Sequence, residues 1–122
     1  MKILVCGSRH FDDWQLFINT INDLSEEFDF DNNQPITIIE GGAKGADFCG
    51  RLYAKYCGWD LEEYPADWKT HGKAAGPIRN GLMLAKGVPD LVVAFLAKDS
   101  RGTADMLRQA EQAKVLTRVV NI

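Results

Sequence analysis

The chain lacks several features that would assign it to a class at once. Its three cysteines, Cys6, Cys49 and Cys57, form no CxxC pair, which favours a reduced protein over a disulfide framework. No apolar run approaches the ~18 residues that are needed to cross a membrane. Met1-Lys2 leads directly into a short apolar run, without the longer stretch of a secretory signal. We therefore expect a cytoplasmic protein with no membrane partner.

Basic residues are missing from a long part of the chain. There is no lysine or arginine between His10 and Ala43. Residues 1–43 hold two basic and eight acidic side chains, whereas residues 44–122 hold twelve basic and nine acidic ones, and the net charge is −3. This balance argues against nucleic acid as a partner. The acidic stretch is either a solvated helix face or a surface that repels nucleic acid or docks a basic partner.

Metal-binding and nucleophile motifs are also missing. His10 and His71 are the only histidines, and neither has a carboxylate or cysteine partner at ligand spacing. No GxSxG motif or suggestive Cys/His pair indicates a covalent nucleophile. We expect no metal and no cofactor.

What is present is typical of a folded domain. The 122 residues are 46% hydrophobic and 25% charged, and we expect them to form a single domain over residues 1–122. Short apolar runs predict strands at residues 2–6, 36–39, 61–64, 91–95 and 115–120. Helices are predicted at about residues 13–27, 44–56 and 77–87 and from residue 103 onward, with a loop over residues 65–75.

This alternation predicts the α/β class, with a mostly parallel five-stranded sheet covered on both faces. Such a sheet binds ligands beyond the carboxyl ends of its strands. The candidate site therefore lies in the loops that follow the strands.

Two glycine loops follow the first two strands. Gly41, Gly42, Ala43, Gly45 and Asp47 belong to the sequence EGGAKGAD between a strand and a helix. This loop is either a plain tight turn or a cradle whose N–H groups bind an anion such as phosphate. Asp47 either favours the helix dipole or accepts a hydrogen bond from a ribose hydroxyl.

The first strand is followed by Gly7, Ser8 and Arg9, which repeat this design. The hydroxyl of Ser8 and the planar guanidinium of Arg9 suit a phosphate group. If the first two strands are neighbours, both glycine loops meet at one edge of the sheet.

Further candidates lie in the second half of the chain. Gly102 precedes Thr103, which is expected to cap the last helix and could add donors to a bound phosphate. Arg79 and Asn80 lie in the first turn of the third helix, where Arg79 opposes the dipole. Arg79 is either solvated or salt-bridged, or it clamps a phosphate or ribose. Trp68 either covers the core or stacks on a base.

Together, GSR (7–9), GGAKGAD (41–47), PADW (65–68), GKAAGPIRN (72–80) and AFLAKDSRGTADM (94–106) resemble the small cpYpsA-related domains of the SLOG family. The resemblance runs from the first strand to about Ala110. It implies a Rossmann-like three-layer α/β/α fold that binds nucleotides or nucleotide-derived molecules. It also implies a sensor role linked to bacterial or phage conflict and a homo-oligomer.

The "lonely guy" phosphoribohydrolases are more distantly similar. They carry RKxxM, of which Arg79 and Met83 are kept, and PGGxGTxxE, of which Gly102-Thr103 is kept. Met106 stands where that family has its glutamate, and a methionine cannot stabilise an oxocarbenium ion or activate water. This departure argues against an enzyme. If the chain is an enzyme, the candidate catalytic residues are Arg79, Asp47 and Asp105.

We therefore expect a module that binds a nucleotide-like small molecule and senses, sequesters or regulates, with a homo-oligomer or a protein effector as partner. The alternative is a hydrolase of the N-glycosidic bond of a nucleoside monophosphate or related nucleotide.

Overall fold

The computed structural model describes residues 1–122, and its centre is one five-stranded parallel sheet. The strands are β1 (Lys2–Gly7), β2 (Thr37–Glu40), β3 (Asp60–Glu63), β4 (Leu91–Leu96) and β5 (Leu116–Asn121). Their order across the sheet is β3-β2-β1-β4-β5, with every neighbouring pair parallel. The winding reverses between β1 and β4, which is where such sheets bind ligands.

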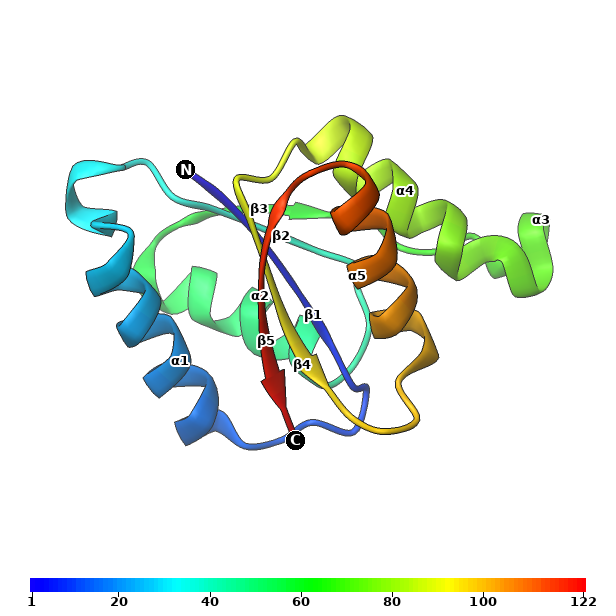
Figure 1. The fold of residues 1–122 in the computed structure, drawn as a ribbon, viewed down its shortest axis with the longest axis horizontal. Helices are drawn as coiled ribbons and strands as arrows, with labels where there is room; N and C mark the ends of the chain where they lie inside the picture. The colour runs from blue at the N-terminus through cyan, green and yellow to red at the C-terminus, as the bar shows by residue number, and fades with distance from the viewer.

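Helices cover both faces of the sheet. α1 (Trp14–Glu27) and α2 (Ala46–Cys57) lie on one side, and α4 (Ala75–Gly87) and α5 (Arg101–Gln112) lie on the other (Figure 1). This is the Rossmann-like three-layer arrangement, and it confirms the fold class expected from the sequence. No helix is long and apolar enough to cross a membrane.

Side chains along the central strands point alternately into two separate hydrophobic cores, one on each face of the sheet. Ile3 and Val5 of β1 pack with the aromatic side of the sheet, where Phe17 of α1 stacks on Phe95 of β4. Leu4 and Cys6 face the opposite core, with Met83 of α4 and Met106 of α5. The period of two along the strands therefore fixes which side chains reach each helix layer.

Local sequence signals account for most element boundaries. The Oδ1 of Asp13 accepts a hydrogen bond from Leu16 N at 3.0 Å, so Asp13 caps α1. Gly58 ends α2 in the left-handed conformation, with φ of 68°. Pro77 is the third residue of α4, not the first, because the helix begins at Ala75.

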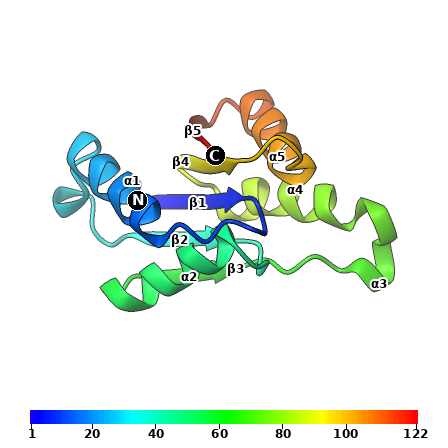
Figure 2. The same ribbon diagram turned by 90° about the horizontal axis from the view of Figure 1, so that it is seen from below.

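Two local predictions were wrong. The expected loop over residues 65–75 contains α3 (Trp68–His71) and a short 3-10 helix (Gly72–Ala74), and α3 lies beyond the strand ends, away from the sheet (Figure 2). Thr103 does not cap the last helix. Because α5 begins at Arg101, Ser100 is the capping position and Thr103 is buried in the first turn.

Candidate functional site

A cavity of about 460 Å³ lies where β1 and β4 end, at the reversal of the winding. Nine of the residues predicted from the sequence line it: Gly7, Ser8, Arg9, Ala43, Asp47, Arg79, Asn80, Gly102 and Thr103. They come from the end of β1 and the loop after it, from the loop after β2 and the start of α2, from α4, and from the first turn of α5. The structure thus brings together segments that are far apart along the chain.

The loop after β1 forms one wall of the cavity. Ser8 N donates to Phe95 O at 3.0 Å, and Ser8 Oγ accepts from His10 N at 3.1 Å. A side chain at Gly7 would come within 2.6 Å of Phe95 O, so glycine permits this contact between the strand ends. Arg9 and His10 remain exposed at the cavity.

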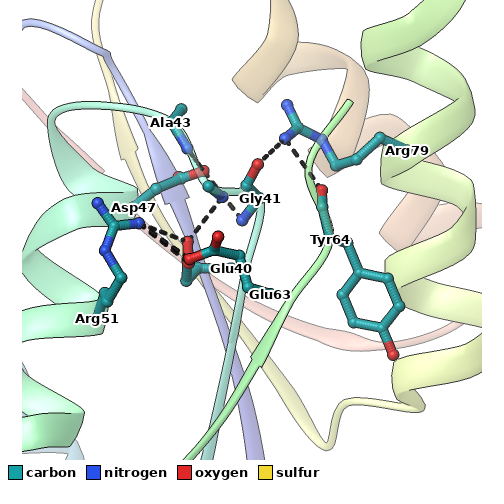
Figure 3. A network of polar contacts seen from close by, with 9 residues as sticks. Glu40, Gly41, Ala43, Asp47, Arg51, Glu63, Tyr64 and Arg79 are labelled. Carbon is teal, nitrogen blue, oxygen red and sulfur yellow. Dashed lines mark hydrogen bonds and ion pairs between the residues drawn. The ribbon is translucent and has the colours of Figure 1, made fainter. Parts of the chain in front are cut away.

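The glycine loop after β2 is held by the carboxylates of its own chain. Asp47 Oδ2 accepts hydrogen bonds from Gly41 N at 3.0 Å and from Ala43 N at 3.2 Å. Glu40 Oε2 accepts from Gly42 N at 2.7 Å (Figure 3). These three N–H groups are therefore already engaged, as a tight turn requires, and Gly41 and Gly42 do not line the cavity.

Gly45 does not line the cavity but lies behind the loops that form its wall. Its φ of 74° and ψ of −125° suit only glycine, and a Cβ there would collide with the backbone of Ser8 and Arg9. Ala46 N donates to Ser8 O at 3.2 Å in the same contact. Gly45 thus lets the loops after β1 and β2 lie against each other.

An ionic network that joins the buried Glu40 to the partly exposed Arg51 and the exposed Glu63 lies behind this loop, and sequence reasoning missed it. Arg51 Nη1 lies 3.2 Å from Glu40 Oε1 and 3.3 Å from Glu63 Oε2. Burial, followed by a hydrogen bond with Glu63, raises the pKa of Glu40 to about 8. The hydrogen bond from Glu40 in turn lowers the pKa of Glu63. The signal in the sequence was an acidic residue closing an apolar strand immediately before two glycines.

Asp47 lines the cavity as a buried carboxyl group. Burial raises its pKa above the ordinary value, although the hydrogen bond from Ala43 N and the charge of Arg79 act in the opposite direction. Its Oδ2 is occupied by the two N–H groups described above, whereas Oδ1 makes no hydrogen bond within the protein.

Arg79 reaches from α4 to the loop after β2. Its Nη1 donates to Gly41 O at 2.5 Å and to Tyr64 O at 3.5 Å (Figure 3). Its Nε donates to Asn80 Oδ1 at 3.2 Å. No carboxylate forms an ion pair with it. The guanidinium group is therefore positioned by neutral hydrogen-bond acceptors, and its charge acts on the buried carboxyl of Asp47 in the same cavity.

Asn80 joins α4 to α5. Its Nδ2 donates to Gly102 O at 3.2 Å and to Asp105 Oδ2 at 3.0 Å. Asp105 also accepts from Gln109 at 2.8 Å and from Arg108 at 2.8 Å. Asp105 does not line the cavity, so the structure separates this candidate acid/base from Asp47.

The first turn of α5 offers the free donors of the site. The N–H groups of Gly102 and Thr103 donate to no acceptor within the protein. Ser100 Oγ instead accepts from Ala97 N at 3.2 Å. Free N–H groups at a helix N-terminus attract anions, and the exposed side chain of Arg101 adds positive charge beside them.

Six lining residues were missed from the sequence: Cys6, His10, Met83, Asp99, Ser100 and Arg101. Arg101 could have been found from its place next to Gly102. Cys6 and Met83 could not, because they belong to the α4–α5 core and only their outer surface reaches the cavity. Burial raises the pKa of the Cys6 thiol, which keeps it protonated and makes it a poor nucleophile.

Trp68 lies outside the cavity. It begins α3, its side chain is 57% exposed, and it lies beside Gly76, where a Cβ would be 3.5 Å from the indole. It therefore does not cover the core. No group of three or more His, Cys, Asp or Glu residues could hold a metal ion.

The fold and the cavity at its winding reversal define a Rossmann-like α/β protein with a polar site at the carboxyl ends of its strands. The family model described as "YspA, cpYpsA-related SLOG family" matches residues 1–71, and the chain belongs to this family. Membership points to a nucleotide-related function. The matched segment ends within α3, so Arg79 and the first turn of α5 lie outside it.

A curated relative extends the similarity over nearly the whole chain. The Gene 61 protein of Mycobacterium phage D29 is 30% identical over 119 residues, which cover 93% of this chain and 91% of the relative. No solved structure matches the chain.

Proposed function

We propose that residues 1–122 act as one SLOG-like domain that binds a nucleotide or nucleotide-derived ligand in the cavity. The observation that carries the proposal is the meeting of unpaired N–H groups, at Gly102 and Thr103, with the guanidinium groups of Arg9, Arg79 and Arg101. These groups favour an anion, and phosphate matches guanidinium geometry. A volume of about 460 Å³ lies within the usual ~300–1,000 Å³ of small-molecule sites.

The remaining polar groups suit the sugar of such a ligand. Asp47 Oδ1 is available to accept a hydrogen bond from a ribose hydroxyl, and the hydroxyl of Ser8 can donate a hydrogen bond. Trp68, which lies outside the cavity, has no role in this arrangement. The protein would then sense or sequester its ligand and act through another copy or an effector protein.

The test is a thermal-shift screen against nucleotides, dinucleotides and ADP-ribose derivatives. A ligand at 100 times its dissociation constant adds about 2.7 kcal/mol to the free energy of unfolding, which is readily measured. The shift should be reduced by Arg101→Gln and by Arg9→Gln. A screen without any shift, or a shift that both variants retain in full, would overturn the proposal.

The alternative is hydrolysis of an N-glycosidic bond, and one observation favours it. The buried carboxyl of Asp47 lines the cavity with a raised pKa, as a general acid requires. The contacts of Asp105 argue against that residue as the acid. Incubation with AMP and related nucleotides should release free base if this function is real, and Asp47→Asn should abolish the release. Binding without release would leave the sensor function standing.

A further inference from the structure

The two edges of the sheet are built differently. Three of the four residues of the β3 edge are acidic, namely Asp60, Glu62 and Glu63, and charge of this kind prevents pairing with another strand. The β5 edge contains no proline and a single charge, Arg118, which is bound to Glu27. Apart from Arg118, whose Nη1 also donates to Thr117 O at 3.3 Å, nothing in β5 protects this edge.

The hydrogen bonds of β5 show which groups face outward. Ile122 N donates to Leu96 O at 3.0 Å, and Leu96 stands in register with Asn121. Because alternate residues of a parallel strand turn both their N–H and C=O groups toward one neighbour, Thr117, Val119 and Asn121 turn theirs away from β4. These three residues present a row of outward-facing donors and acceptors with Val119 in the middle, in which only Thr117 O has a partner, Arg118 Nη1 at 3.3 Å.

An apolar groove runs beside this row. It lies between α5 and β5 and is lined by Leu96, Ala104, Leu107, Val115, Leu116 and Val119. Leu116 and Val119 are 46% and 43% exposed. Arg108 and Lys114 stand at the groove with Glu111, so both signs of charge are present. A surface of one sign would repel a second copy of itself, whereas this mixed surface can meet its own opposite charges.

We propose that β5 pairs antiparallel with β5 of a second copy of this chain, about a two-fold axis beside Val119. Val119 then pairs with Val119 of the partner subunit, and Thr117 pairs with Asn121 of the partner subunit. All three outward-facing residues are satisfied, and two five-stranded sheets become one of ten strands. The groove is covered because the two α5 helices lie on the same face of the joined sheet.

This pairing goes beyond the proposed ligand binding and leaves it undisturbed. The cavity lies at the ends of β1 and β4, and no residue of β5 lines it. Each copy therefore keeps a complete site. The antiparallel pairing turns the two sites to opposite ends of the assembly.

The first experiment measures molar mass by light scattering and sedimentation over a wide range of protein concentration. We expect twice the chain mass of 13.6 kDa for the unaltered protein. Val119→Lys places a charge in the groove and at the pairing edge of both copies, and should weaken association at least roughly tenfold. Leu61→Lys at the β3 edge is the matched control and should leave the dimer intact. Circular dichroism checks that both variants are folded.

Hydrogen exchange of the unaltered protein gives a second readout that needs no variant. The N–H groups of Thr117, Val119 and Asn121 should exchange fast at low concentration and become protected as the dimer forms, while those of β3 should not change. The ligand-induced thermal shift should persist in Val119→Lys, which separates this proposal from ligand binding.

Three results would overturn the proposal. The first is a monomer at every concentration, and the second is a dimer in which these three N–H groups stay unprotected. The third is a dimer that survives Val119→Lys but is lost in Leu52→Lys. That third result would move the interface to the exposed stripe of Phe48, Leu52 and Tyr56 on α2.

Discussion

The loop after β2 and the first turn of α5, which follows β4, both contain glycine where a strand leads into a helix, yet they use their backbones in opposite ways. In the first, the N–H groups of Gly41, Gly42 and Ala43 donate to carboxylates of Glu40 and Asp47. In the second, the N–H groups of Gly102 and Thr103 have no acceptor in the protein. Whether nearby carboxylates point at the N–H groups of the turn therefore decides if those groups are engaged or free to bind a ligand, since Asp99 lies close to the second turn without accepting from it.

The two segments therefore have different roles in the site. The loop after β2 is a fixed support that places Asp47 and receives Arg79 on the carbonyl of Gly41. The first turn of α5 carries the free donors and the charge of Arg101. Substitutions in the first loop should therefore change stability, and substitutions in the second should change binding.

The largest expected contrast is between Gly45→Ala and Gly102→Ala. A methyl group at Gly45 meets the backbone of Ser8 and Arg9 at a φ that favours glycine, so we expect a loss of roughly 4 kcal/mol in the free energy of unfolding. A methyl group at Gly102 meets nothing within 4 Å, so stability should hold or rise by up to ~1 kcal/mol. Urea denaturation measures both. Equal losses would show that the two loops are equally constrained.

The next contrast concerns the carboxylates. Asp47→Ala leaves the N–H groups of Gly41 and Ala43 without their acceptor, and we expect a loss of about 3 kcal/mol. Asp99→Ala, at an exposed residue of the same cavity with no hydrogen bond through its side chain, should change stability by less than ~0.5 kcal/mol. Thermal unfolding of both variants checks this. A mild effect of Asp47→Ala would mean that another group holds the loop.

A smaller contrast concerns ligand affinity. Arg101→Gln removes a charge beside the free N–H groups and should weaken binding of a phosphate-bearing ligand about tenfold, or ~1.4 kcal/mol. Lys44→Gln removes an exposed charge from the closed loop, outside the cavity, and should change affinity by less than about twofold. Calorimetric titration with the best compound of the screen measures both. The reverse order would assign the anion to the loop after β2.

A last expected effect is a dependence of stability on pH. The pKa of Glu40 is raised from 4.5 to about 8 in the folded protein, so folding favours its protonated form. Its contribution is fully present below about pH 4.5 and is lost as the pH rises toward 8. Glu40→Gln should flatten this decline, since an amide resembles the protonated acid. Denaturation curves between pH 5 and pH 8.5 check the sign, and a variant that declines as steeply as the unaltered protein would contradict it.

The sequence predicted the sheet well because its signal is local. Each strand is a short apolar run, and alternation with amphipathic helices leaves few topologies open. The residues that cap the helices were harder to predict. Ser100 and Thr103 are both good capping residues, and only the position of the backbone shows that α5 begins at Arg101. α3 was missed because its four residues have no apolar period, although Asp67 caps it by accepting from Thr70 N.

The cavity itself was partly predictable. Loops after neighbouring parallel strands must meet, and this placed Arg9 and Gly102 together with Arg79. The closure of the loop after β2 could not be read from the sequence, since it depends on where the Glu40 and Asp47 carboxylates point. The sequence also could not predict whether Trp68 reaches the site, because that depends on the direction in which α3 leaves the sheet.

Because the sheet separates the core into two layers, the stability losses caused by substitutions in different layers should be additive. Phe17 and Met83 are buried on opposite sides and share no cluster of neighbours. Truncating both should cost the sum of the single losses, whereas truncating Phe17 with Phe95, which stack on each other, should not. The central strands β1, β2 and β4 are the exception to this independence, because successive residues of each strand belong to both layers.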